Sequence, residues 1–204
     1  MTVNKDQHIT VDGTVGDVHV ATGGTLLGVG KVKNLIVDTG GIVAPGHSPG
    51  CLTADNLSLS GTYQAQLEGT EPCHSYDQIT VTGAIILKGK LEVSLGKGFK
   101  PMAGQRYTLI NNTGTQSIKG TFTGLAEGAT IKADGYTFQI TYKGGTGNDA
   151  VLTARLAADT ASVSSLQKSD NPLSYIALAI LLLAAAAAGV VVVRKRRSGP
   201  RRKA

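Results

Sequence analysis

The chain of 204 residues contains no tryptophan, and its six tyrosines and three phenylalanines make up only 4% of it. Large aromatic side chains normally dominate a globular core, so their scarcity predicts a thin, elongated core. Glycine, in contrast, is abundant, with 27 residues. A glycine-rich chain with many Val, Leu and Thr favours short strands joined by turns. No stretch before residue 154 has a convincing helical period, so the sequence predicts an all-β fold.

Basic residues are scarce outside the C-terminal tail. The last eleven residues, RKRRSGPRRKA, hold seven of the 20 Lys and Arg and no acid, so residues 1–193 carry 13 basic against 14 acidic residues. The net charge of +6 is therefore a property of the tail. A nucleic-acid surface spreads Lys and Arg over the folded part and interleaves them with aromatics. That pattern is missing, so nucleic acid is not an expected partner.

The one long apolar run is LSYIALAILLLAAAAAGVVVV, residues 173–193, which contains no charged residue. As a helix it would cover about 32 Å, against a hydrocarbon core of about 30 Å. The sequence therefore predicts a single transmembrane helix, with membrane lipid as a partner. Four basic residues follow the run: Arg194, Lys195, Arg196 and Arg197. The positive-inside rule then predicts a cytoplasmic tail and an extracellular N-terminal domain, anchored in the cell membrane by a single pass.

Two features leave alternatives open for this anchor. The first alternative is a sorting signal cleaved by a sortase-like enzyme, although no LPxTG-like motif precedes the run. The second concerns export, because the N-terminus, MTVNKDQHIT, lacks the apolar h-region of a signal peptide. We therefore expect the chain to be truncated at its start. The rival explanation is a tail-anchored protein whose N-terminal domain stays in the cytoplasm.

Thr-Gly and Ser-Gly pairs recur just before apolar, strand-like runs. They lie at 22–23, 39–40, 60–61 and 82–83, with spacings of 17, 21 and 22 residues. Periods near 20 residues with glycine at the corners predict a β-solenoid, in which each rung buries its apolar face on its neighbours. An irregular β-sandwich is the alternative, because the repeat is loose.

Five segments, in this order, resemble a bacterial surface family: GGIVAPGHSPGCLTADNLSLSGTY, YDQITVTGAIILKGKLEVSL, PMAGQRYTLINN, GTFTGLAEGATI and FQITYKGGTGNDAVLT. Residues 39–153 look like the C-terminal part of autotransporter-associated β-helix repeat proteins, large surface-exposed or secreted passenger domains. The Pro-Gly-x-Ser-Pro-Gly step at 45–50, followed by Tyr-Asp-Gln at 76–78, is fairly specific, whereas single glycine-rich rungs are not. The resemblance implies a right-handed β-helix and a non-enzymatic, often adhesive, surface role. The family ends in an outer-membrane β-barrel, and here a single transmembrane anchor takes its place.

The expected fold class is therefore all-β, a right-handed β-solenoid end with a β-rich C-terminal cap, followed by one transmembrane helix. The domain organisation that we expect is solenoid turns over 1–45, the last turns and the β cap over 46–155, a flexible stalk over 156–172, the transmembrane helix over 173–193 and a basic cytoplasmic tail over 194–204.

The residues that suggest chemistry gather in two short stretches, 40–53 and 72–77. A Cys-His nucleophile or a zinc site can be drawn from four of them: His47, Cys51, Cys73 and His74. Their spacing lacks the Cys-x2-Cys or His-x3-His pairs of compact zinc modules. Adjacent Cys73 and His74 would also point to opposite faces of an extended strand, which hinders joint ligation.

We prefer a structural interpretation of these stretches, in which Cys51 and Cys73 form one disulfide in a non-reducing compartment. Their separation of 22 residues is about one solenoid turn. Gly46 and Gly50, each preceded by proline, then make tight turns, with glycine taking a positive φ. Two free thiols, or a metal or catalytic site, are the alternatives.

Residues 144–152, GGTGNDAVL, match the calcium-binding nonapeptide Gly-Gly-x-Gly-x-Asp-x-apolar-x, with Asp149 as the carboxylate and Val151 as the apolar plug. Such sites need stacked copies, because each ion lies between neighbouring turns. There is one copy here, so Asp149 is a weak calcium candidate and the stretch is better explained as a glycine turn into the last strand. We expect no metal and no other cofactor.

The predicted function is that of a membrane-anchored bacterial cell-surface protein with a structural or adhesin-like, non-catalytic role. Its expected partners are a host or neighbouring cell surface or the extracellular matrix. One alternative is a surface polysaccharide-acting enzyme. Such enzymes cluster carboxylates or basic residues on one face, and the acids here are scattered, so the active site would lie in a missing N-terminal part. Another is a pure capping module that ends a longer solenoid and protects its open edge.

Overall fold

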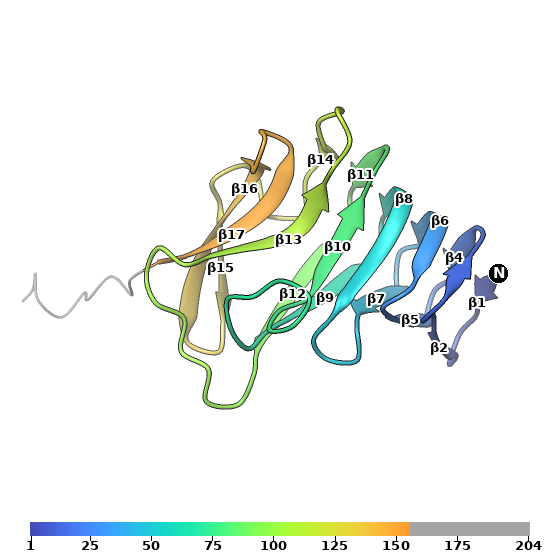
Figure 1. The fold of residues 1–204 in the computed structure, drawn as a ribbon, viewed down its shortest axis with the longest axis horizontal. Coiled ribbons are helices and arrows are strands. Elements are labelled where there is room, and N and C mark those ends of the chain that lie inside the picture. Colours follow the sequence, from blue (N-terminus) through green and yellow to red (C-terminus); the bar gives the residue numbers. More distant parts are fainter. Residues whose placement is uncertain (156–204) are drawn as a thin grey trace, which may run out of the picture. The chain divides into compact units, whose positions relative to one another are not determined.

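The computed structural model describes residues 1–155, which form 17 β-strands in two sheets and contain no helix (Figure 1). The larger sheet, sheet A, has twelve strands: β1 (Thr2–Val3), β3 (Thr14–Val15), β4 (Val18–Val20), β6 (Lys31–Val37), β8 (Cys51–Leu59), β10 (Gln78–Val81), β11 (Ile85–Leu87), β13 (Arg106–Asn112), β14 (Lys119–Gly120), β15 (Thr130–Ala133), β16 (Tyr136–Gly144) and β17 (Asp149–Arg155). The smaller sheet, sheet B, has five: β2 (His8–Thr10), β5 (Thr25–Gly28), β7 (Ile42–Pro45), β9 (Thr62–Leu67) and β12 (Lys90–Leu95).

Aliphatic residues in register form the core of the first half of the chain. Strands up to β13 pair in parallel, so that Leu35 lies beside Leu57, which in turn lies beside Ile85, and all three are buried. A second column holds Val37, Leu59 and Leu87. Because successive residues of a strand point to opposite faces, each strand needs an apolar residue only at alternate positions. This explains how so few aromatic residues suffice for this half of the core.

Three of the four repeated glycine pairs mark corners where the chain passes from one sheet to the other, whereas the pair at 82–83 lies between β10 and β11, both in sheet A. The pair at 22–23 lies between β4 and β5, the pair at 39–40 between β6 and β7, and the pair at 60–61 between β8 and β9. Gly40 has a φ of +83°, and a Cβ on the next residue, Gly41, would lie only 2.7 Å from the carbonyl oxygen of Val20. Only glycine permits such a close approach of two backbone segments.

The C-terminal part of sheet A changes strand direction. β13 is parallel to β10 on one side and antiparallel to β17 on the other, and β15, β16 and β17 form antiparallel pairs. The turn between β15 and β16 is Asp134–Gly135, with φ of 47° and 84°. Two residues with positive φ close an antiparallel hairpin, whereas parallel strands need a longer crossover. The Asp-Gly pair is visible in the sequence, but the sequence analysis did not use it.

The predicted all-β composition is therefore correct, but the predicted fold class, a β-solenoid end followed by one helix, is wrong. In place of a β-solenoid followed by a helix, the structure has a mixed sheet and a parallel sheet, and it has no helix within residues 1–155. The hairpin turns of the C-terminal strands account for the mixed sheet.

The membrane part of the prediction also needs correction. Among residues 1–155 there is no helix long and apolar enough to cross a membrane, so the transmembrane helix and the single-pass localisation that was based on it have no support in the structure. The segments on which those predictions depended, 156–172, 173–193 and 194–204, lie outside the described residues, and so do the four basic residues after the apolar run.

Candidate functional site

The corner loop, residues 46–50, connects β7 of sheet B to β8 of sheet A. Gly46 has a φ of +85°, as predicted for a turn glycine. Gly50 does not have a positive φ. Glycine is needed there because the backbone packs closely, and a Cβ on Gly50 would lie only 2.5 Å from the Cα of Gly46. The positive φ that the prediction gave to Gly50 belongs to Ser48, at 73°. The corner loop therefore doubles back on itself so tightly that both glycines are needed.

A disulfide joins Cys51, at the start of β8, to Cys73, in the loop between β9 and β10. Their Cα atoms are 4.7 Å apart, a normal separation for a disulfide. The predicted bond is confirmed, and since the chain has two cysteines, no thiol is left for a nucleophile or a zinc ligand. In the chain-entropy model a loop of this size contributes about 3 kcal/mol to the free energy of unfolding.

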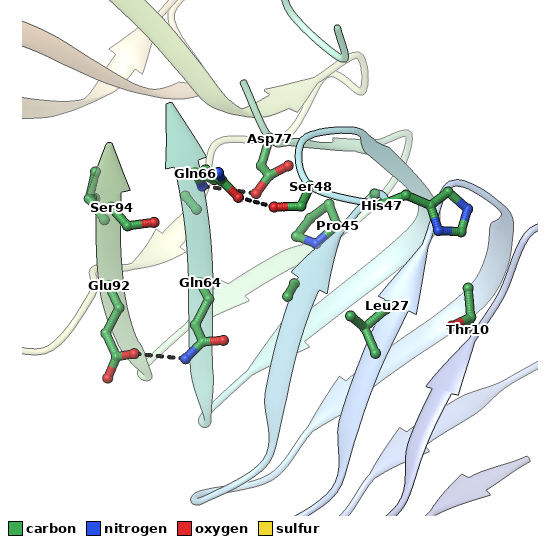
Figure 2. Close-up of a pocket in the computed structure, with 14 residues that line it drawn as sticks. Thr10, Leu27, Pro45, His47, Ser48, Gln64, Gln66, Asp77, Glu92 and Ser94 are labelled. Carbon is green, nitrogen blue, oxygen red and sulfur yellow. Dashed lines mark hydrogen bonds between the residues drawn. The ribbon is translucent and has the colours of Figure 1, made fainter. Parts of the chain in front are cut away.

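The two histidines and the serine of the candidate site do not converge. The Nε2 of His47 lies 2.9 Å from Oδ1 of Asp12, and both side chains are more than half exposed. The hydroxyl of Ser48 donates a hydrogen bond to Oε1 of Gln66, and Nδ1 of His74 lies 3.3 Å from the carbonyl oxygen of Pro72. Figure 2 shows the side chains of His47 and Ser48 leaving the corner loop in different directions. A serine nucleophile activated by either histidine is not formed here.

Asp77 also belongs to this site, although the interpretation from the sequence gave it no role. Its carboxylate is buried, with 4% of the residue exposed, and it accepts hydrogen bonds from the N–H of Gly50 at 2.7 Å and from the N–H of Gln66 at 2.8 Å. Burial raises the pKa of Asp77 to about 6, although the two backbone N–H groups lower it; the charge of Glu68 raises it further. The carboxylate thus ties the corner loop to β9.

The flanking residues of the Tyr-Asp-Gln motif anchor the neighbouring strand β13. The side-chain nitrogen of Gln78 donates to the carbonyl oxygen of Thr108 at 2.7 Å. The N–H of Thr108 donates to the hydroxyl of Tyr76 at 3.3 Å, and the ring of Tyr76 meets that of Tyr107 edge-on, with centroids 5.5 Å apart. The motif could have pointed to Asp77, because Asp77 holds the corner loop while Tyr76 and Gln78 hold β13.

An open groove of about 660 Å³ runs over the face of sheet B that points away from the core (Figure 2). In β9 the buried residues Tyr63, Ala65 and Leu67 alternate with polar residues, and Gln64 and Gln66 project on the groove side. Its lining comes from all five strands of sheet B, from the corner loop and from Asp77: Thr10, Leu27, Ala44, Pro45, Gly46, His47, Ser48, Gln64, Ala65, Gln66, Asp77, Glu92, Val93 and Ser94. We call this feature the sheet B groove.

The register of sheet B orders the lining into rows. Thr10 pairs with Leu27, which pairs with Ala44. Farther along the sheet, Gln64 pairs with Glu92, and the side-chain nitrogen of Gln64 donates to Oε2 of Glu92 at 3.0 Å. The groove therefore crosses the strands instead of running along one of them.

Asp149, the weak calcium candidate, has a structural contact instead. It is buried, and its Oδ1 accepts a hydrogen bond from the N–H of Asn112 at 2.9 Å, which joins the end of β13 to the start of β17. Val151 is buried as the apolar residue of the same turn. Within residues 1–155 no three His, Cys, Asp or Glu side chains gather in an arrangement that could hold a metal ion.

Comparison with known proteins finds neither a protein-family model nor a curated protein that matches this chain. The resemblance to autotransporter-associated β-helix repeat proteins therefore stays a prediction from the sequence.

Proposed function

We propose that this chain is a non-catalytic, structural or adhesin-like protein of a bacterial cell surface. Its partner would be a host or neighbouring cell surface or the extracellular matrix. The sequence resemblance implies such a role, and the two sheets offer extended outward faces on which side chains follow one another in register.

One observation carries this proposal: the side chains that suggest chemistry are engaged in holding the corner loop. The thiols of Cys51 and Cys73 are joined to each other, Ser48 is bonded to Gln66, and the carboxylate of Asp77 accepts two backbone N–H groups. A general base or nucleophile must be free to reach a reacting atom. These groups are instead bonded within the protein and stabilise the corner loop.

The disulfide supports a location outside the reducing cytoplasm. Disulfides persist in secreted and surface proteins and are rare where thiols are kept reduced. A surface role is consistent with a fold whose tightest corner carries such a bond.

A polysaccharide-acting enzyme is the second candidate, because two carboxylates, Asp77 and Glu92, line the same groove. A carboxyl group with a raised pKa is typical of a general acid, and the pKa of Asp77 is about 6. Both oxygens of Asp77 are nevertheless occupied by backbone donors, which weakens this candidate.

The experiment that tests the proposal compares adhesion with catalysis. Beads coated with the full chain are applied to bacterial and host cells, while the same chain is incubated with neutral and acidic polysaccharides and followed for new reducing ends and unsaturated products. We expect adhesion without product. Absence of adhesion would contradict the adhesin-like role. Product release that is lost in both Asp77→Asn and Glu92→Gln would establish the enzyme instead.

A further inference from the structure

We propose that the sheet B groove is a binding site for a neutral glycan, an uncharged polymer of sugar units. This inference rests on the proposed adhesin-like function and names the class of ligand that such a protein would hold. It is drawn from the shape of the groove, the chemistry of its lining and the pairing of its strands.

The shape of the groove fits a linear polymer. Its volume of about 660 Å³ is within the usual range for a ligand site. Because all five strands of sheet B contribute to the lining, the groove extends across the sheet in the direction in which the strands follow one another. An extended chain molecule can therefore lie along it over several strands.

The lining combines an apolar floor with groups that both donate and accept hydrogen bonds. Leu27, Ala44 and Pro45 supply the apolar surface, against which the C–H faces of a sugar ring can pack. Side-chain amides, hydroxyls and a carboxylate surround that floor: Thr10, Ser48, Gln64, Gln66, Glu92 and Ser94. Amides and hydroxyls donate and accept, as sugar hydroxyls do, so the two sets complement one another without any net charge on the ligand.

The charges around the groove disfavour an anionic ligand. Its lining, which consists entirely of described residues, includes the carboxylates Asp77 and Glu92 and contains no Lys or Arg. Two further carboxylates contact residues of the lining. Glu68 accepts a hydrogen bond from the amide of Gln66 at 2.6 Å, and Asp12 pairs with His47. Nucleic acids and uronic-acid polymers need cations on the protein. Among glycans, these charges therefore favour a neutral polymer over an acidic one.

The pairing of the strands disfavours a peptide. A peptide that binds by strand addition needs a free sheet edge with unpaired backbone groups. The groove lies over the face of sheet B, and its central strands β5, β7 and β9 each pair with a neighbour on both sides. Over these central strands the ligand meets mainly side chains, which suits hydroxyl groups better than a peptide backbone.

The polar lining is fixed before a ligand arrives. Gln64 is bonded to Glu92, Gln66 is bonded to Ser48, and the backbone N–H of Gln66 is bonded to the buried carboxylate of Asp77. A lining that is already ordered loses little entropy on binding. The groove has no aromatic residue for a sugar to stack on, so each site binds weakly, and many copies on one surface would supply avidity.

The test uses beads densely coated with the full chain and an array of immobilised probes. The probes are neutral glucan, mannan and galactan oligosaccharides, with polygalacturonate, heparin and unstructured peptides for comparison. We expect retention on one or more neutral glycans and none on the other probes. Gln64→Ala removes an exposed amide, and Ala44→Ile fills the floor of the groove with a branched aliphatic side chain that offers no flat face to a sugar; each should lower binding about tenfold or more.

Two matched control variants make the same kinds of substitution at residues outside the sheet B groove. Gln139→Ala removes a strand glutamine of β16, Ser58→Ile adds a branched aliphatic side chain to sheet A, and both residues lie outside the groove. Both controls should bind as the unchanged chain does, with thermal unfolding recorded for every variant.

Four outcomes would overturn the inference: retention only on acidic glycans, retention only on peptides, no retention on any neutral glycan, or neutral-glycan binding that neither Gln64→Ala nor Ala44→Ile reduces. If the same beads still adhere to cells, the glycan inference alone fails. If they do not, the adhesin-like function fails with it.

Discussion

The two halves of the described structure build their cores from different residues. The first aromatic residue of the sequence is Tyr63, so the strands from β1 to β8 are stacked entirely with aliphatic side chains in parallel register. Strands β13, β15, β16 and β17 form antiparallel pairs, and this part of the structure buries Tyr107, Phe122 and Phe138.

The difference shows how each half is held together. In the parallel half every strand repeats the contacts of its neighbour, so the energy of the core is spread over many small side chains. In the C-terminal half single aromatic residues bridge segments that do not repeat. The hydroxyl of Tyr142, for example, accepts from the N–H of Phe122 at 2.9 Å and donates to the carbonyl oxygen of Leu125 at 2.7 Å. The sheet B groove belongs to the repeating half, and the aromatic half completes the fold.

The largest effect should come from truncating an aromatic residue in the C-terminal half. Phe122 is fully buried, and its ring lies 6.4 Å from that of Tyr63 and 6.2 Å from that of Tyr142. Phe122→Ala should lower the free energy of unfolding by about 4 kcal/mol, and Leu57→Ala in the parallel half by about 3 kcal/mol. Denaturant unfolding of both variants measures the difference. An equal or larger loss for Leu57→Ala would contradict the contrast.

Removal of the disulfide tests how far the parallel half depends on its covalent link. The Cys51→Ser, Cys73→Ser double variant should lose about 3 kcal/mol in the free energy of unfolding, because the unfolded chain regains the entropy of an open loop. The unchanged chain treated with a reductant is the control and should shift by a similar amount. A variant as stable as the oxidised protein would show that the bond contributes nothing.

The two halves should respond to acid in opposite directions. The pKa of Asp77 in the folded protein is raised to about 6 from 3.8, so its ionised form disfavours folding, and the free energy of unfolding should rise by about 2 kcal/mol between pH 7 and pH 4. The pKa of Glu127 is lowered by hydrogen bonds from Thr141 and from the N–H of Tyr142, so the stability it provides is lost as the pH falls below its usual range.

Unfolding as a function of pH separates these contributions. Asp77→Asn should abolish the gain between pH 7 and pH 4, and Glu127→Gln should lessen the loss at lower pH. A gain on acidification that persists in Asp77→Asn would assign it to another group.

The smallest effect should follow removal of the two histidines of the candidate site. His47 and Asp12 form an exposed pair, and such pairs contribute little. We expect His47→Ala and His74→Ala each to change the free energy of unfolding by no more than about 0.5 kcal/mol. Gly46→Val is the contrasting variant at the same corner and should cost about 2 kcal/mol, because a β-branched residue is strained at its positive φ. Thermal unfolding compares the three.

The sequence could predict the parts of this structure that depend on local pattern. The alternation of apolar and polar residues in KLEVSL and YTFQITY is typical of half-buried strands, which are observed as β12 and within β16, and three of the four glycine pairs mark corners between the sheets. The disulfide could be predicted because two cysteines and one plausible compartment leave few choices. The prediction of a solenoid end with a β-rich cap did not include the mixed sheet, and Asp134–Gly135, which closes a hairpin there, is the local signal for it.

The sheet B groove could not be predicted, because it depends on distances across the sheet. Gln64 and Glu92 are 28 residues apart and meet only through the pairing of β9 with β12. The pKa of Asp77 is raised because its carboxyl group is buried against the corner loop. The residues next to Asp77 in the sequence do not reveal this burial. Composition had suggested that the acids are scattered, and the fold brings two of them to one groove.

Hydrogen exchange of the full chain, with and without the best neutral glycan from the array, tests most directly whether the repeating half carries the binding function. We predict slower exchange of amides in β7, β9, β12 and the corner loop, with β15, β16 and β17 unchanged. Protection in β15, β16 and β17, or no protection in any of the strands that line the groove, would contradict the account.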